Sequence, residues 1–350
     1  MRFRILSGVA ALAFAVPAAV ASSAVPVLAD PGQPQPDGAA YTFGVIGDIP
    51  YGAEQLAAFP GMVTELNEQD DLRFISHVGD IKAGSEQCTD ERFGVVKDQF
   101  DRFEAPLVFT PGDNEWVDCH RENNGAFNPL ERLDTLRDMF FAEPDRTLGG
   151  TMRVDSQDAI GLPENVRFAE NRVAFSVVNV QGSNNALAPW SGLGHTEPTA
   201  EQVAEVWHRT DAGLAQLRET FDDAERTRAR AVVVMTQADM FTPGQEKAAL
   251  ADPASVSGFA PVVEALAEEA AAFDGPVYLV NGDSHVFHED EPLTAGSPWL
   301  EVYGVEPVDN LQRVTVEGSA TSGEWLRVSV AANSAKTDEV LTWERVPFSE

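Results

Sequence analysis

The chain has 350 residues and a formal net charge of -32, with 24 lysines and arginines against 56 aspartates and glutamates. Nucleic acids and anionic membrane surfaces are bound by clustered Lys and Arg, so we expect neither to be a partner. The length suits one large domain or two closely joined ones, and we expect one.

The chain begins with the order of a secretory signal peptide, because Arg2 and Arg4 precede an apolar stretch over residues 5–20. We predict three parts: a signal peptide over 1–29, a Pro-rich lead-in over 30–39 and a folded domain over 40–350. The alternative is an uncleaved membrane anchor, although Pro17 and the many alanines make a poor permanent span. The expected location is periplasmic or secreted, with no membrane association after cleavage.

Five apolar, β-rich runs predict buried strands, because each ends in polar residues typical of a loop. They are Tyr41 to Asp48, Leu72 to Asp80, Leu107 to Asn114, Ala231 to Gln237 and Val277 to His285. Helical patterns over 53–67 and 91–103 separate the first three runs, which predicts a largely parallel sheet. Functional groups of such sheets gather at the carboxyl ends of the strands, so we expect the polar residues there to form one site.

The rest of the chain predicts further strands over 172–180, 311–317 and 325–331 and helices over 199–224 and 256–273. The last two strands alternate apolar and polar residues, which indicates antiparallel strands of a second sheet packed on the first. The stretch 144–171 has weak periodicity and predicts a long loop around the domain. Asn184 and Asn185 either line a cleft or occupy a left-handed turn.

Cys88 and Cys119 are the only two cysteines. In an exported chain such a pair usually closes, and we predict a disulfide. The alternatives are two buried thiols or a pair of metal ligands, but two cysteines this far apart do not have zinc-site spacing.

Short motifs follow the five strands predicted first: Gly47-Asp48-Ile49-Pro50, Gly79-Asp80-Ile81-Lys82, Gly112-Asp113-Asn114-Glu115, Gln237, and Gly282-Asp283-Ser284-His285. In this order they resemble the loops of the calcineurin-like metallophosphoesterase superfamily, which read Asp-x-His, Gly-Asp, Gly-Asn-His followed by Asp or Glu, a His after a strand, and Gly-His-x-His. Each motif alone is weak, because Gly-Asp is a common turn. The ordered set implies an α/β fold, the four-layer α/β/β/α sandwich of that superfamily, and a metal-dependent phosphoric ester hydrolase.

The resemblance implies six metal ligands: Asp48, Asp80, Asp113, Gln237, Asp283 and His285. Asp80 would bridge two divalent ions, with Asp48 and His285 on the first ion and the other three on the second. The first-loop histidine of the family falls on Pro50, which cannot bind a metal, and two further family histidines are replaced by an amide and a carboxylate. We expect one or two divalent ions, Mn, Mg, Ca, Fe or Zn, and such an oxygen-rich site suits Mg, Mn or Ca better than Zn.

The third loop departs most from the family pattern. The family asparagine falls on Asp113, and the histidine that donates a proton to the leaving group falls on Asn114, which has no proton to give. Asn114 is then expected to orient the phosphoryl group. A register shifted by one residue would instead make Asn114 the ligand and place Glu115 beside the leaving group, and both registers stay open.

Lys82 and His120 complete the predicted catalytic residues. Lys82 lies two residues past the second-loop aspartate, where its ammonium could hold a phosphate oxygen or replace part of a lost cation's charge. His120 and Arg121 follow Cys119, so we expect the disulfide to bring one of them to the site. The other histidines, such as His77, are expected to be structural.

The favoured function is hydrolysis of a small-molecule phosphate ester outside the cytoplasm, by a water whose pKa the ion pair lowers. One alternative is a degenerate member of the fold that keeps a metal for structure or ligand binding and does no catalysis. Another is an anion-binding module without metal that uses Lys82 and Arg121. Monoester, diester and pyrophosphate substrates are not distinguished, and neither is the oligomeric state.

Overall fold

A computed structural model describes residues 38–335, 337 and 339–349. The predicted signal peptide and most of the predicted lead-in lie outside these residues. Among the helices of the described part, none combines the length and the apolar character of a membrane span.

The first sheet contains the three strands predicted nearest the start of the chain. Its order is β13-β12-β1-β2-β3-β4, and β1, β2 and β3 run parallel to one another. The strands are β1 (Tyr41–Ile46), β2 (Leu72–His77), β3 (Pro106–Phe109), β4 (Leu148–Gly149), β12 (Glu324–Val330) and β13 (Leu341–Pro347). Three helices pack against this sheet: α1 (Gly52–Asn67), α2 (Asp90–Phe100) and α3 (Pro129–Phe140).

The second sheet has the order β10-β11-β9-β8-β7-β6-β5, with β11, β9, β8 and β7 parallel. Its strands are β5 (Asp155–Gln157), β6 (Leu162–Glu170), β7 (Val173–Val177), β8 (Ala231–Met235), β9 (Val277–Asn281), β10 (His288–Asp290) and β11 (Leu311–Thr315). The remaining helices lie with it: α4 (Gly182–Asn185), α5 (Ala200–Thr227), α6 (Glu246–Ala251), α7 (Ala260–Ala272) and α8 (Trp299–Tyr303). Helix α5 begins at a capping box, in which Thr199 and Gln202 bond each other's backbone N–H.

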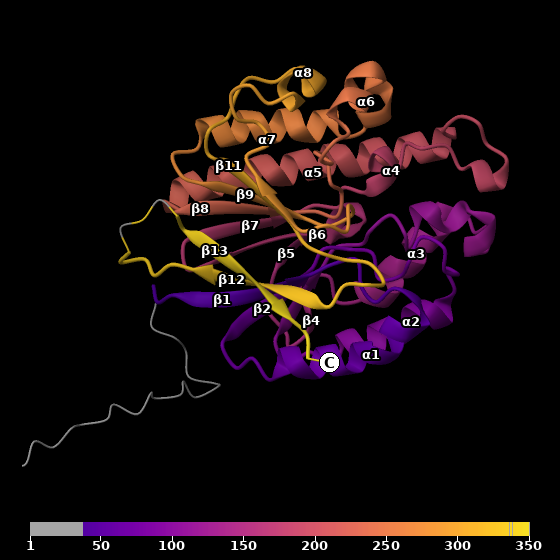
Figure 1. Ribbon diagram of the computed structural model, residues 1–350, viewed down its shortest axis with the longest axis horizontal. Coiled ribbons are helices and arrows are strands. Elements are labelled where there is room, and N and C mark those ends of the chain that lie inside the picture. Colours follow the sequence, from indigo (N-terminus) through magenta and orange to yellow (C-terminus); the bar gives the residue numbers. More distant parts are fainter. Residues whose placement is uncertain (1–37, 336, 338, 350) are drawn as a thin grey trace, which may run out of the picture. The chain divides into compact units, whose positions relative to one another are not determined.

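The two sheets pack face to face, with helices outside each, so the predicted α/β/β/α order is confirmed (Figure 1). Their shared core is rich in valine and contains an aromatic cluster. Phe43 of β1 stacks on Phe74 of β2 at 4.7 Å between ring centroids, and Phe175 of β7 meets both rings edge-on. Such interlocked rings add to the burial energy and fix the spacing of the two sheets. That spacing brings the carboxyl ends of strands from both sheets to one region.

Two expectations were wrong. Residues 144–171 are not a loop but carry β4, β5 and β6, and the strands predicted at the end belong to different sheets. Strand β6 was not predicted because its buried part contains the polar residues Glu164 and Asn165. The cost of burying them is offset by an ion pair between Glu164 and Arg137 at 2.6 Å and by a hydrogen bond from the Asn165 amide to Gln157. Strand β12 returns to pair with β1, whereas β11 pairs with β9.

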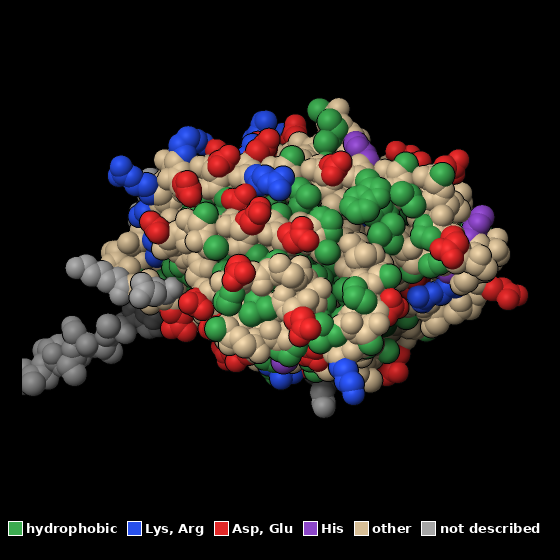
Figure 2. Space-filling view, turned by 90° about the horizontal axis from the view of Figure 1, so that it is seen from above, with side chains coloured by type: hydrophobic (Ala, Val, Ile, Leu, Met, Phe, Trp, Pro, Cys, Tyr) green, Lys and Arg blue, Asp and Glu red, His purple; other side chains and the backbone are tan. Residues whose placement is uncertain are grey.

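Acidic side chains are spread over the face above α7 and α8 (Figure 2). There they stay in water, where a charge costs little. The carboxylates buried at the strand ends lack this solvation.

Candidate metal centre

All six predicted ligands lie just beyond the carboxyl ends of strands. Asp48, Asp80 and Asp113 follow β1, β2 and β3 of the first sheet, while Gln237 follows β8 of the second sheet. Asp283 and His285 both follow β9. Because the two sheets pack together, loops of the first sheet contact loops of the second, as the contacts of Asp113 with Gln237 and of Asp48 with Asp283 show.

Asp48, Asp80 and His285 come together from three different strands. Each offers one ligand atom, and these atoms lie within 4.8 Å of one another. Both carboxylates are almost fully buried, whereas the imidazole is 38% exposed, with its Nε2 atom 3.3 Å from Asp48 Oδ1. A mixed set of carboxylates and imidazole at this spacing can hold a divalent ion.

Tyr51 joins this group, although no pattern in the sequence analysis singled it out. Its hydroxyl lies 2.9 Å from Asp80 Oδ2, 3.3 Å from His285 Nε2 and 3.4 Å from Asp48 Oδ1. Neighbouring ligands of one six-coordinate ion, each about 2.1 Å from it, are separated by about 3 Å. The spacing of the Tyr51 oxygen from these three atoms thus matches that of neighbouring ligands of one ion, and Tyr51 lies on the loop that carries Asp48.

The third loop touches Asp80 through Asn114. The backbone N–H of Asn114 donates to Asp80 Oδ1 at 3.0 Å, and its side-chain amide donates to Asp80 Oδ2 at 2.8 Å and to the Tyr51 hydroxyl at 2.7 Å. Glu115 instead accepts backbone N–H groups of Asp80 and Gly112 at 3.1 and 2.6 Å. Glu115 thus ties the second loop to the third, and Asn114 is the side chain aimed at the ligands.

Asp113 faces the second sheet. Its Oδ1 accepts from the Gln237 amide at 3.3 Å, and its Oδ2 accepts from the Ser183 hydroxyl at 2.8 Å. The Gln237 carbonyl oxygen meanwhile accepts the Gly182 N–H at 2.6 Å. These bonds align Asp113 and Gln237 side by side, but each already has a protein partner.

Asp283 contacts the first group through its backbone. Its backbone N–H donates to both oxygens of Asp48, at 3.2 and 3.1 Å, while its own Oδ2 accepts the Asp239 N–H at 3.1 Å. Asp113 and Gln237 contact each other, whereas the hydrogen bonds of Asp283 go to Asp48 and Asp239, so no bond between Asp283 and the other two residues joins the second predicted set.

Backbone strain marks the same residues. Asp48, Asp80, Asp283 and His285 have φ angles of 54°, 61°, 74° and 64°, in the left-handed region that side chains other than glycine rarely adopt. Such conformations cost energy and persist where the surroundings impose them, which is common at functional sites.

The carboxylates of the centre repel one another in a dry setting. Burial raises the pKa of Asp80 well above its ordinary value, and Asp113 is the neighbouring charge that adds most. Burial and Asp113 raise the pKa of Asp283 in the same way, and burial raises that of Glu115 to about 7. A bound cation would relieve both causes, because it compensates the negative charge where water cannot.

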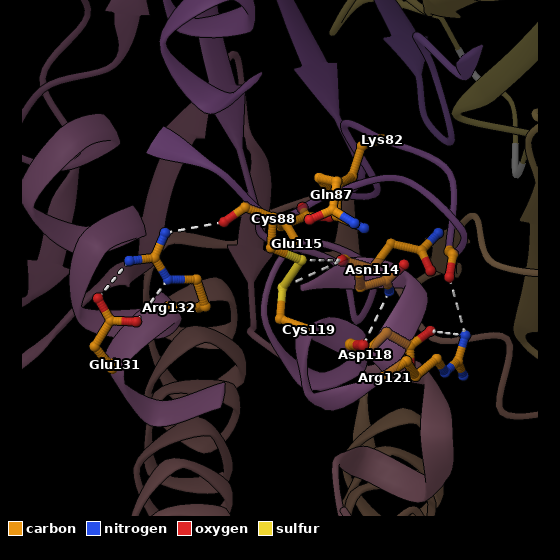
Figure 3. The surroundings of a disulfide bond; sticks show 12 residues. Lys82, Gln87, Cys88, Asn114, Glu115, Asp118, Cys119, Arg121, Glu131 and Arg132 are labelled. Carbon is orange, nitrogen blue, oxygen red and sulfur yellow. Dashed lines mark hydrogen bonds and ion pairs between the residues drawn. A yellow bond between two sulfur atoms is a disulfide. The ribbon is translucent and has the colours of Figure 1, made fainter. Parts of the chain in front are cut away.

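The predicted disulfide joins Cys88 and Cys119 (Figure 3). The two sulfur atoms lie 3.6 and 3.7 Å from the backbone oxygen of Asn114, directly behind the loop that carries it. The bridge therefore contacts the third loop at the backbone of Asn114, the residue whose side chain donates to Asp80.

Beyond the disulfide, Arg121 and His120 contact different loops. Arg121 forms an ion pair with Asp118 at 2.5 Å and reaches the Gly84 carbonyl, as Figure 3 shows. His120 Nδ1 accepts the Gly192 N–H at 3.2 Å, so its described partner lies in another loop. The described partners of both side chains are residues other than the predicted ligands, so the expectation that the bridge brings one of them to the site stays a prediction.

Lys82 is fully buried and donates to the Ala83 carbonyl at 3.0 Å. Burial lowers its pKa to about 8, against the opposing effect of nearby carboxylates, of which Glu115 is the largest. Its ammonium therefore supplies one internal positive charge beside the acidic loops.

His77 is structural, as expected. Its Nε2 donates to the Ile49 carbonyl at 2.8 Å and its Nδ1 accepts the Gly79 N–H at 3.2 Å, which joins the first two loops through a neutral imidazole. Burial lowers the pKa of His77 to about 4.

The free energy of unfolding should therefore depend on pH through His77. The unfolded chain takes up this proton near pH 6.5 and the folded chain only near 4, so stability is lost as pH falls across that window, by roughly 3 kcal/mol. Urea titrations of wild type and His77→Gln between about pH 7 and 4 check this. The difference between the two proteins should change by that amount, and a difference that is constant with pH would contradict it.

No family model and no curated protein matches the chain. Solved structures match the chain at low identity. A dimetal phosphatase from Danio rerio is 12% identical with a TM-score of 0.46, and the match covers 88% of this chain and 99% of that one. The anchor protein GAP50 of the Plasmodium inner membrane complex is 10% identical with a TM-score of 0.45, covering 89% and 90%.

A purple acid phosphatase from yellow lupin seeds is also 10% identical with a TM-score of 0.45, and the match covers 89% of this chain but only 52% of the lupin protein. Two of these three proteins are phosphatases by name. At such low identity the likeness concerns the fold, and the chemistry of this chain depends on its own residues.

Proposed function

We propose that this protein is an exported, metal-dependent phosphoesterase that hydrolyses a small-molecule phosphate ester. The observation that carries the proposal is the meeting of Asp48, Asp80 and His285, whose ligand atoms lie within 4.8 Å of one another at strand ends of both sheets. The internal disulfide supports export, since disulfides persist in oxidising compartments such as the periplasm and the medium.

The residues fit a divalent ion by their chemistry. The donor set is mostly hard oxygen, and the raised pKa of Asp80 reflects buried negative charge that the surrounding residues do not balance. The proposed ligands are Asp48, Asp80, His285 and Tyr51 for one ion, and Asp113, Gln237 and Asp283 beside Asp80 for a second. When bound, such ions would lower the pKa of a water and neutralise charge on the phosphoryl oxygens.

Asn114 would act on the substrate directly. Its amide donates to Asp80 and to Tyr51, so it would donate to a phosphoryl oxygen by exchanging one of these acceptors for the substrate. It cannot protonate a leaving group, so we expect esters with acidic leaving groups to react fastest. Lys82 would balance negative charge, while His120 would take part only if its ring left Gly192.

The alternative is a protein that keeps one ion for structure or ligand binding and does not catalyse. Two features favour it. Hydrogen bonds within the protein already occupy Asp113 and Gln237, and the Asn114 amide has no acidic proton to give to a leaving group. On this alternative the first group alone would hold metal.

Metal analysis of the purified protein, combined with hydrolysis assays, tests the proposal. Aryl and alkyl phosphomonoesters and phosphodiesters would be offered with Mn, Mg, Ca or Zn. We expect metal-dependent turnover, with aryl esters faster than alkyl esters. One tightly held ion without turnover on any substrate would favour the non-catalytic alternative, and a protein that binds none of these metals would refute the site.

A further inference from the structure

A run of left-handed backbone lies beside the candidate centre. Ser183, Asn184, Asn185 and Ala186 have φ angles of 53°, 56°, 53° and 68°, in the turn labelled α4. Residues other than glycine visit this region singly, and asparagine does so more readily than most. Four in succession must be imposed by contacts around them, because each costs conformational energy.

Those contacts come from the two asparagines. Asn184 accepts the Gly258 N–H at 2.8 Å and donates to the Ala254 carbonyl at 3.0 Å. Asn185 is fully buried, donates to the Gly258 carbonyl at 3.0 Å and accepts from the Arg209 guanidinium at 2.5 Å. The turn is therefore stabilised by hydrogen bonds to residues outside the candidate centre.

On its other side the turn presents Ser183 to the acidic loops. The Ser183 hydroxyl donates to Asp113 Oδ2 at 2.8 Å and lies 3.4 Å from Asp118 Oδ1. The preceding Gly182 is equally close, since a Cβ added there would lie 2.6 Å from Asp113 Oδ2. The contacts of Asn184 and Asn185 thus stabilise a strained turn from which the Ser183 hydroxyl donates to the Asp113 carboxylate.

We propose that this turn exists to hold Ser183 as a positioning residue for Asp113, which aligns that carboxylate for the second ion; the inference rests on the proposed function. A hydrogen bond to a ligating carboxylate fixes its orientation, and loss of such a supporting partner typically weakens metal affinity about 10- to 100-fold. Asp113 has a second partner in Gln237, but the bond from Ser183 is the shorter one.

Three substitutions at Ser183 separate positioning from a purely structural role. Ser183→Gly removes the hydroxyl and also the backbone strain, so it should weaken binding of the second Mn²⁺ about 10- to 100-fold while the melting temperature is kept or raised. Ser183→Ala should weaken it equally. Ser183→Thr keeps the hydroxyl but puts a β-branched residue at positive φ, so it should keep affinity and lower the melting temperature.

The matched control is Arg228→Gly, which relaxes a φ of 56° at the end of α5, away from these loops. It should leave both Mn²⁺ affinities unchanged. Binding is measured by isothermal titration with Mn²⁺ alone, and folding by circular dichroism. Two wild-type-like binding events in both the Gly and Ala variants would overturn the inference, as would a wild-type protein that binds one ion, with the single-ion function left standing. A wild-type protein that binds no Mn²⁺ would overturn the proposed function as well.

Discussion

Asp80→Asn should abolish metal-dependent hydrolysis while leaving the metal-free protein at least as stable as wild type. The carboxylate lies at the meeting point of three loops and contacts Asn114 and Tyr51. Loss of a residue that supports a metal ligand typically costs about 10- to 100-fold, so loss of the proposed shared ligand should cost more, roughly 10³-fold in kcat/KM. Stability of the metal-free protein should not fall, because burial and neighbouring carboxylates raise the pKa of Asp80 and so disfavour its charged form. The neutral amide of asparagine removes the repulsion between Asp80 and these carboxylates.

The measurement pairs a kinetic assay with thermal unfolding in the presence and absence of Mn²⁺. Wild type should gain melting temperature on addition of the ion, and the variant should gain little. Asp223→Asn, which alters an exposed ion pair with Arg167 and Arg226, serves as control and should leave both readouts unchanged. An Asp80→Asn protein with wild-type activity would remove Asp80 from the mechanism.

Removal of the disulfide should cost about 3 to 4 kcal/mol in the free energy of unfolding. The bridge closes a loop with a sequence separation of 31 residues, and the chain-entropy relation for such a loop gives this size. The variant is Cys88→Ala combined with Cys119→Ala, compared by urea unfolding with the oxidised wild type. The contact of both sulfurs with the Asn114 carbonyl adds a local effect, so metal affinity should fall as well (Figure 3).

The reduced wild type provides the matched control, because it keeps both sulfur atoms in place and loses only the bond. If the bridge acts mainly through chain entropy, the reduced protein and the double variant should have similar stabilities. Unchanged stability in both would show that the bridge is dispensable for the fold.

Strands β1, β2, β3, β8 and β9 and the loops that follow them could be predicted from the sequence, because uninterrupted apolar runs that end in polar loop residues are typical of buried strands. Strand β6 could not, since Glu164 and Asn165 are buried there with partners far away in the chain. The apolar pattern that identifies a buried strand is interrupted when polar residues are buried with hydrogen-bonding partners. Those partners are brought close only by the tertiary fold, so the sequence does not reveal them.

The residues of the centre divide in the same way. Asp48, Asp80 and His285 were recognisable from motif order, and the disulfide from the number of cysteines. Tyr51 and Ser183 were not, because neither stands at a position of the family motifs and their roles arise from the packing of one loop on another. A tyrosine three residues after the first-loop aspartate was the available signal for the first of them.

The return of β12 to pair with β1 has a consequence for the order of folding. Tyr41 of β1 is paired with Val330 of β12, so the first sheet joins residues nearly 290 positions apart and cannot be completed until most of the chain has been synthesised. Until then β1 would be an open edge, and the loop bearing Asp48 would lack its support from Ser319, whose N–H donates to the Asp48 carbonyl. In an exported chain the centre would thus take shape only after the last strands have crossed the membrane.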